Sequence, residues 1–142
     1  MKEEEVIALS NLCNFKADHV SPLKQEASGR KYWRVSNTSD SFVLCYLDPT
    51  IGNHLDFIQI TNSLQNNNIN SVNVIHHNDE HGLTLQEDLG DKDLLSILNT
   101  ENKTELIEKS LDLLIQIQNA DIKNIDRFTD NELTDQMYLF KN

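Results

Sequence analysis

The sequence predicts an α+β domain built on a five-stranded, mostly antiparallel sheet with flanking helices. Strand-like runs occur in two groups, three before a central helix and two after it, which is an order typical of α+β proteins. Hydrophobic residues at helical spacing mark helices at the start, in the middle and in the second half. The length of 142 residues, with 38% hydrophobic and 25% charged residues, suits one globular domain.

The first half is predicted to contain one helix and three strands. Residues 1–14 carry an acidic first turn and one apolar face, formed by Val6, Ile7, Leu9, Leu12 and Cys13. Residues 19–24 are a weak strand candidate, because Pro22 confines such a strand to an edge or an end. Residues 32–35 predict the next strand, in which either Tyr32 or Trp33 faces the core. Residues 41–47 predict the strongest strand, a continuous apolar run.

The second half is predicted to contain a helix, a two-stranded hairpin and three further helices. Their expected positions are residues 55–64, 72–75 with 83–86, 94–98, a long helix from 102, and 129–142. Asn102 and Glu105 have the spacing of a capping box at the start of the long helix. The last segment, Glu132–Phe140, is rich in large apolar side chains with no helix stop after it. We therefore expect that the chain is cut short.

Charge and cysteine content exclude several classes of partner. The chain has 12 Lys and Arg against 23 Asp and Glu, a net charge of -11, which disfavours nucleic acid and anionic membrane surfaces. The two cysteines, Cys13 and Cys45, are too few for a disulfide framework. No segment approaches the ~20 apolar residues of a membrane span, and the start is acidic rather than basic. We expect a cytoplasmic protein without a nucleic-acid or membrane partner.

Positive charge is concentrated in one region. Five of the 12 basic residues lie between Lys16 and Arg34, and none lies between Val35 and Asp91. Ser28–Lys31 forms a cationic turn in which Gly29 is free to take a positive φ, so backbone N–H groups and Arg30 could hold a phosphate. The alternative is a hairpin tip that carries solubilising charge.

Three other patterns have a structural explanation that we favour. His77 and His81 have the spacing of a zinc site only on a helix, whereas residues 78–82 predict a turn. His54–Asp56 resembles part of a kinase catalytic loop, but Thr61 stands where the matching Asn should be. Asp91 and Asp93 could pair for Mg²⁺, although an acidic helix start is commoner.

Several segments, taken in order, carry a resemblance to a known family. They are Ala27-Ser-Gly-Arg-Lys-Tyr-Trp-Arg34, Ser41-Phe-Val-Leu44, Asp56-Phe57, Asn70–Ile75, Gly82–Gly90 and Glu132–Phe140. Together they resemble the N-terminal lobe of the aminoglycoside phosphotransferase-like kinases. The subgroup that they resemble most is the bacterial kinases that phosphorylate the anomeric hydroxyl of N-acetylmuramic acid and N-acetylglucosamine.

The resemblance implies a protein-kinase-like N-terminal lobe over residues 1–90, and helices leading into a second lobe over 91–142. It implies ATP with Mg²⁺, and transfer of the γ-phosphoryl group to a hydroxyl of a cell-wall amino sugar, with an aminoglycoside or choline-like acceptor left open. The implied nucleotide-binding residues are Ser28, Gly29, Arg30 and Lys31 at the phosphates, the backbone of Glu87, Asp88 and Leu89 at the adenine, and Leu44, Ile75 and Leu85 as apolar walls.

Two departures from the kinase pattern change what we expect of this chain. The strand over 41–47 lacks the lysine that protein kinases place on the phosphates, so the cation would come from Arg30, Lys31 or Arg34. The family's catalytic and metal-binding residues belong to the second lobe. We therefore expect no catalytic residue and no metal ligand here, and little phosphoryl transfer by this chain alone.

Two alternatives remain open at this point. One is a free-standing interaction domain that docks a partner through Met137–Phe140. The other is a kinase remnant that lacks catalytic activity.

Overall fold

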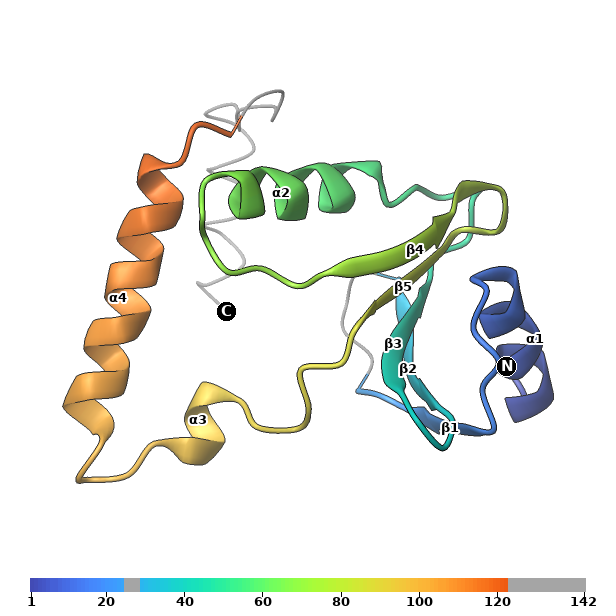
Figure 1. The fold of residues 1–142 in the computed structure, drawn as a ribbon, viewed down its shortest axis with the longest axis horizontal. Coiled ribbons are helices and arrows are strands. Elements are labelled where there is room, and N and C mark those ends of the chain that lie inside the picture. The colour runs from blue at the N-terminus through green and yellow to red at the C-terminus, as the bar shows by residue number, and fades with distance from the viewer. Residues whose placement is uncertain (25–28, 123–142) are drawn as a thin grey trace, which may run out of the picture.

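A computed structural model describes residues 1–24 and 29–122. The elements in these ranges follow the expected order of helix, three strands, helix, two strands and helices (Figure 1). They are α1 (Glu3–Leu12), β1 (His19–Pro22), β2 (Lys31–Ser36), β3 (Ser41–Tyr46), α2 (Leu55–Asn66), β4 (Val74–Asn78), a 3₁₀ turn (Asp79–His81), β5 (Leu83–Glu87), α3 (Leu94–Ile97) and α4 (Lys103–Asn119).

The five strands form one open sheet in the order β1-β2-β3-β5-β4. All four neighbouring pairs are antiparallel, so the predicted α+β class and strand number are confirmed and the pairing is antiparallel throughout. β1 is an edge strand and Pro22 is its last residue. This agrees with the expected position, because proline has no N–H to donate to a sheet.

One face of the sheet packs against α1 and forms the main hydrophobic core. Val6 and Cys13 of the α1 region meet Trp33 and Val35 of β2 there, so Trp33 is the aromatic residue that faces the core. Leu44, Leu83 and Leu85 complete this core from β3 and β5 and are almost completely buried. At the start of α1, the Glu5 carboxylate accepts a hydrogen bond of 2.6 Å from the Lys2 backbone N–H.

The opposite face of the sheet is partly covered by α2. Figure 1 shows α1 and α2 on different sides of the sheet. Alternation along the strands places Tyr32 and Cys45 on this second face, where they lie beside Phe57 of α2 and His54, the residue before it. The candidate site lies on this face.

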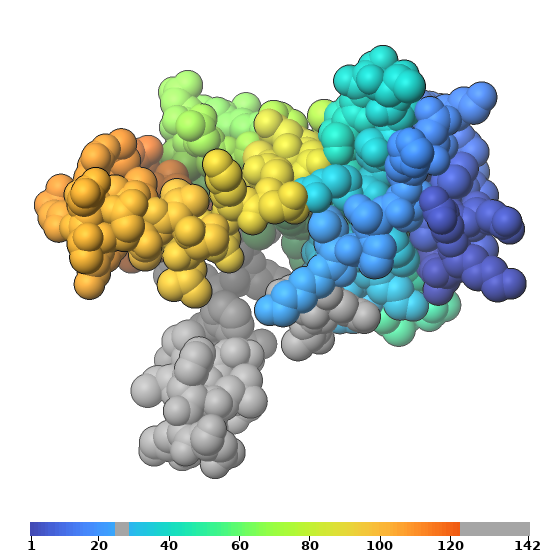
Figure 2. Space-filling view, turned by 90° about the horizontal axis from the view of Figure 1, so that it is seen from below, coloured from blue at the N-terminus to red at the C-terminus, as the bar shows by residue number. Residues whose placement is uncertain are grey.

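α3 and α4 extend to the end of the molecule opposite α1 (Figures 1 and 2). None of the residues of α4 is buried, although its apolar residues have the predicted helical spacing. The capping box predicted at its start is wrong. The Asn102 side chain instead accepts from the Asn99 backbone N–H at 2.8 Å and donates to the Ile97 carbonyl at 2.9 Å, so it stabilises the preceding turn.

β4 differs most from the prediction. It runs over Val74–Asn78 rather than 72–75, and an irregularity between Val74 and His76 leaves Ile75 about half exposed. Just before β4, the Ser71 hydroxyl donates to the Thr61 carbonyl, the Asn73 N–H donates to the Glu87 side chain, and the Asn73 carbonyl accepts from the Glu87 N–H. The helix predicted over 129–142 lies outside the described residues.

No helix in the described part of the chain is long and apolar enough to cross a membrane.

Candidate functional site

A cavity of about 290 Å³ lies between the uncovered part of the sheet, α2 and the linker that follows β5. Its lining combines polar and apolar side chains from the sheet with residues of the linker. The lining residues are Leu23, Tyr32, Arg34, Val43, Phe57, Val72, Gln86, Glu87, Asp88, Leu89 and Gly90. We call this space the outer cavity.

A smaller cavity of about 80 Å³ adjoins the outer cavity. Tyr32, Phe57 and Gln86 line both cavities, so these three side chains form the boundary between them. The other lining residues are Arg30, Cys45 and His54. Arg30 therefore lines the inner cavity, and the linker lines the outer cavity.

Strand alternation decides which predicted residues reach the site. In β3, Val43 lines the outer cavity and Cys45 the inner one, whereas Leu44 between them lies in the core against α1. In β5, Gln86 lines both cavities and its cross-strand partner is Val43. Leu44 and Leu85 pair with each other on the opposite face, so the structure does not bring them to the site.

The residues of the cationic turn also differ in whether they line a cavity. Arg30 lines the inner cavity. Lys31, one residue later, is exposed and lines neither of the two cavities. Gly29 has a φ of +72°, as expected for this turn, and Ser28 lies outside the described residues. The third cation considered, Arg34, lines the outer cavity but is engaged by acidic side chains.

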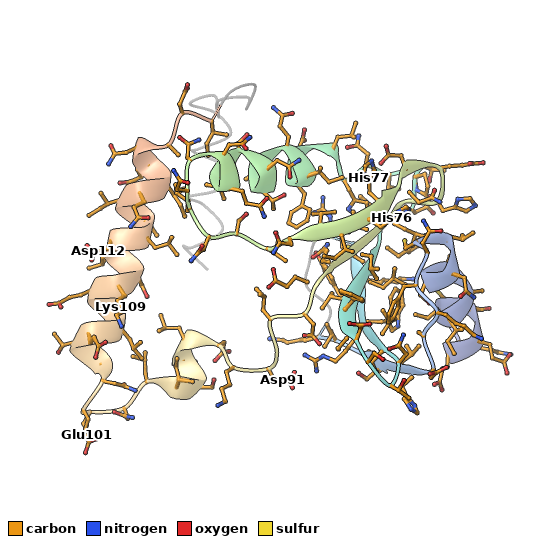
Figure 3. All side chains as sticks on the ribbon, viewed as in Figure 1. His76, His77, Asp91, Glu101, Lys109 and Asp112 are labelled. Atoms are coloured by element: carbon orange, nitrogen blue, oxygen red, sulfur yellow. The ribbon has the colours of Figure 1, made fainter. Side chains whose placement is uncertain are left out.

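Arg34 joins β2 to the linker through a cluster that we call the Arg34 clasp, formed by Arg34, Ser41, Asp88 and Asp91. Arg34 donates from Nε to Asp88 Oδ2 at 2.7 Å and from Nη2 to Asp88 Oδ1 at 3.0 Å. Its Nη1 donates to Asp91 Oδ1 at 2.8 Å, and Ser41 Oγ donates to Asp88 Oδ2 at 2.6 Å. Figure 3 shows Asp91 on the linker between β5 and α3.

The clasp holds Asp88 ionised. The Arg34 hydrogen bonds, with smaller contributions from Ser41 and the Gly90 N–H, lower the pKa of Asp88 to about 2 from an ordinary value of 3.8. The Asp88 side chain is only 11% exposed, so water screens this interaction weakly. Arg34 is not available for another anion while these bonds exist.

Acid should therefore weaken the fold through Asp88. Because the folded-state pKa of Asp88 lies below the unfolded value, its stabilisation is complete above pH 5 and is lost as the pH falls through 4 towards 2. We expect the difference in unfolding free energy between the wild type and Asp88→Asn to narrow by roughly 2 kcal/mol over that range. Urea unfolding at several pH values measures this difference, and a constant difference would contradict the assignment.

The sequence indicated His54 only as part of a pattern that resembles a kinase catalytic loop. In the structure Asp56 lies in the first turn of α2, and His54 is a buried residue that lines the inner cavity. It is 2% exposed, and its Nε2 lies 3.0 Å from the Gly82 carbonyl oxygen, which can only accept, so Nε2 carries the proton. Burial lowers the pKa of His54 and keeps the ring neutral. Within the described residues Nδ1 has no hydrogen-bond partner. His54 is the last residue of the loop between β3 and α2, and it is buried although neighbours such as Ile51 and Leu55 are exposed.

The structure supports the structural explanation of the other histidines. His76 and His77 lie on β4 (Figure 3), and His81 ends the 3₁₀ turn, so His77 and His81 do not share a helix. The described residues contain no group of three or more His, Cys, Asp or Glu side chains that could hold a metal ion. Met137–Phe140, the surface of the alternative interaction domain, lies outside the described residues.

Comparison with known proteins indicates a distant relative of this chain. No protein-family model matches the chain. A stretch of 103 residues is 31% identical to the N-acetylmuramate/N-acetylglucosamine kinase of Pseudomonas putida. The match covers 72% of this chain and 30% of that kinase, so the chain spans about a third of the length of the curated relative that it matches. This similarity supports a distant relationship to sugar kinases.

Proposed function

We propose that the chain is the ATP-binding part of a small-molecule phosphotransferase. Residues 1–90 would form a kinase-like nucleotide-binding lobe, and 91–142 would lead into a second lobe. The reaction would transfer the γ-phosphoryl group of ATP to a hydroxyl of an amino sugar. The sugar-kinase similarity supports the reaction class, and the two adjoining cavities support the position of the nucleotide.

The outer cavity suits the adenine base. Val43 and Val72 offer apolar surface to the faces of a planar ring, in place of Leu44 and Leu85. Leu89 on the linker lines the same cavity. Its backbone N–H and C=O have no hydrogen-bond partner among the described residues, so both are available to the polar edge of a base. The Glu87 N–H, in contrast, donates to the Asn73 carbonyl.

The position of Arg30 in the inner cavity is the single observation that carries the phosphate assignment. It lines the inner cavity together with Cys45 of β3, the strand in which a lysine was missing. Arg30 forms no ion pair with any described residue, whereas Arg34 binds two carboxylates. A guanidinium that has no ion pair within the described residues and lines a cavity is suited to bidentate binding of phosphate oxygens. We assign no Mg²⁺ ligand to the described residues, because the kinase resemblance implies that the metal-binding residues lie in the second lobe.

The Arg30→Ala variant tests this assignment. We expect its affinity for Mg·ATP to fall roughly 10- to 100-fold, because a charge-assisted hydrogen bond contributes about 1.5–3 kcal/mol. Its affinity for adenosine, which has no phosphate, should not change. Isothermal titration calorimetry on the 142-residue chain measures both ligands.

Lys31→Ala is the matched control. It removes a cation from the neighbouring residue, but the side chain lies outside both cavities, so we expect less than about a twofold change in Mg·ATP affinity. Equal losses of Mg·ATP affinity in the two variants would mean that Arg30 acts only through its positive charge. That result would contradict its role in binding phosphate. Absence of Mg·ATP binding by the wild type would contradict the proposed function itself.

The acceptor is proposed from the name of the relative alone. An amino-sugar hydroxyl is the proposed acceptor, and we propose that this chain by itself transfers little phosphoryl group, because the kinase resemblance implies that the catalytic and metal-binding residues lie in the second lobe. A kinase assay with N-acetylglucosamine and N-acetylmuramic acid tests both statements. Full-rate turnover by this chain would overturn the second.

A further inference from the structure

Arg34 lines the outer cavity, and its guanidinium donates hydrogen bonds to two carboxylates of the linker. It bonds Asp88 through two atoms and Asp91 through a third. β2 is an interior strand of the sheet, bonded to β1 and β3. Arg34 therefore connects a rigid element to the segment that carries Leu89.

Asp88 is the centre of this connection. Its two carboxylate oxygens accept four hydrogen bonds: two from Arg34, one from Ser41 at the start of β3, and one of 3.0 Å from the Gly90 N–H. The carboxylate thus ties together β2, β3 and the turn of the linker itself. Leu89 lies between Asp88 and Gly90, so its backbone is fixed on both sides by a single carboxylate.

We propose that Arg34 is a positioning residue that holds the linker backbone at Leu89 in the geometry that reads the base of the nucleotide. The proposal rests on the proposed function, because it assigns Leu89 to base recognition. It makes Arg34 responsible for selecting the base and leaves the phosphates to Arg30. Arg34 itself touches no reacting group.

The linker has little else to keep it in place. The Leu89 side chain is 72% exposed, and Gly90 has a φ of +80° with no heavy atom near the position of an added Cβ. Backbone of this kind moves when its polar anchors are lost. The planar guanidinium is suited to this role, since it can bond two carboxylates in fixed directions, whereas a lysine ammonium is a point charge without that geometry.

The test compares three ligands on the 142-residue chain: Mg·ATP, Mg·GTP and magnesium tripolyphosphate. For Arg34→Lys and Asp88→Asn we expect roughly a tenfold loss of ATP affinity, a fall in the ATP-to-GTP preference, and unchanged tripolyphosphate affinity. Hydrogen exchange at residues 88–91 should accelerate in both variants, while exchange in β2 and β3 should not. Ser41→Ala, which removes one bond to Asp88, should give the same pattern with a smaller loss of about threefold.

Lys109→Ala is the control for loss of an ion pair far from the site, because Lys109 pairs with Glu105 on α4 at 2.6 Å. It should change none of the three affinities. Equal weakening of ATP and tripolyphosphate, or an unchanged ATP-to-GTP preference in all three clasp variants, would overturn the positioning role. If the proposed function itself were wrong, the wild type would bind neither ATP nor tripolyphosphate. That outcome is distinct from the two results above.

Discussion

Replacing Gly82 with alanine is expected to cost at least about 3 kcal/mol of folding free energy, because a side chain there meets both backbone strain and a backbone clash. Gly82 has a φ of +61°, in the left-handed region. A Cβ at this position would lie 1.9 Å from the Leu47 carbonyl oxygen and 3.2 Å from Cδ of Pro49. Neither atom belongs to a flexible side chain, so the chain itself must move.

Movement at Gly82 would also disturb neighbouring bonds. Its carbonyl oxygen accepts from the Leu47 N–H at 2.9 Å and lies 3.0 Å from Nε2 of His54. The turn between β4 and β5 is therefore tied to the end of β3 and to the start of α2. Because His54 lines the inner cavity, we expect Gly82→Ala to weaken nucleotide binding as well as the fold.

Gly90→Ala is the matched control. Gly90 also has a positive φ, +80°, but an added Cβ would meet no heavy atom within 4 Å. Its cost should be only the conformational strain, about 1 kcal/mol. Urea unfolding followed by circular dichroism compares the two variants, and equal costs would show that the close approach to Leu47 does not exist.

Leu44→Ala is expected to destabilise the protein by about 3 kcal/mol while leaving the walls of the proposed nucleotide site intact. Leu44 is fully buried and packs in the core with its cross-strand partner Leu85. Removing three side-chain carbons there leaves a cavity that the surrounding side chains fill only in part. Unfolding in urea measures the loss.

The adjacent residue provides the contrast. Val43 is half-buried on the other face, so Val43→Ala should cost only about 1 kcal/mol of stability but lower the affinity for Mg·ATP. If Val43→Ala destabilised the protein as much as Leu44→Ala and left nucleotide binding unchanged, the assignment of the two sheet faces would be contradicted.

Local patterns in the sequence were sufficient for the class of fold. The period-two and helical patterns predicted the strands at 32–35 and 41–47 and the helix at 55–64 within about two residues at each end. β4 was misplaced because its later residues, His76–Asn78, are polar and have no strand-like pattern of their own. They are in a strand because β5 pairs with them, which is a tertiary effect that a local pattern does not contain.

The site was predictable only in part. The resemblance pointed to residues 28–31 and 87–89, and the linker at Glu87–Leu89 lines a cavity next to one that contains Arg30. The sequence contained a signal against Leu44 and Leu85 as walls of the site. If Trp33 faces the core, alternation and pairing place Val43 on the other face. The Arg34–Asp88 bond had no such signal, since it depends on how β2 and the end of β5 are placed across β3.

The strand order also sets the order in which the fold can assemble. β1, β2 and β3 pair between close neighbours in the chain, and β4 and β5 form a hairpin of their own. Among the strand pairs of the described residues, β3–β5 is the one that joins these two units, and it must close the whole segment from residue 47 to 82, with α2 inside it. The largest entropy cost of loop closure in this sheet therefore falls on the formation of the β3–β5 pair. Without this pairing the β1–β3 unit and the β4–β5 hairpin would be two separate small sheets.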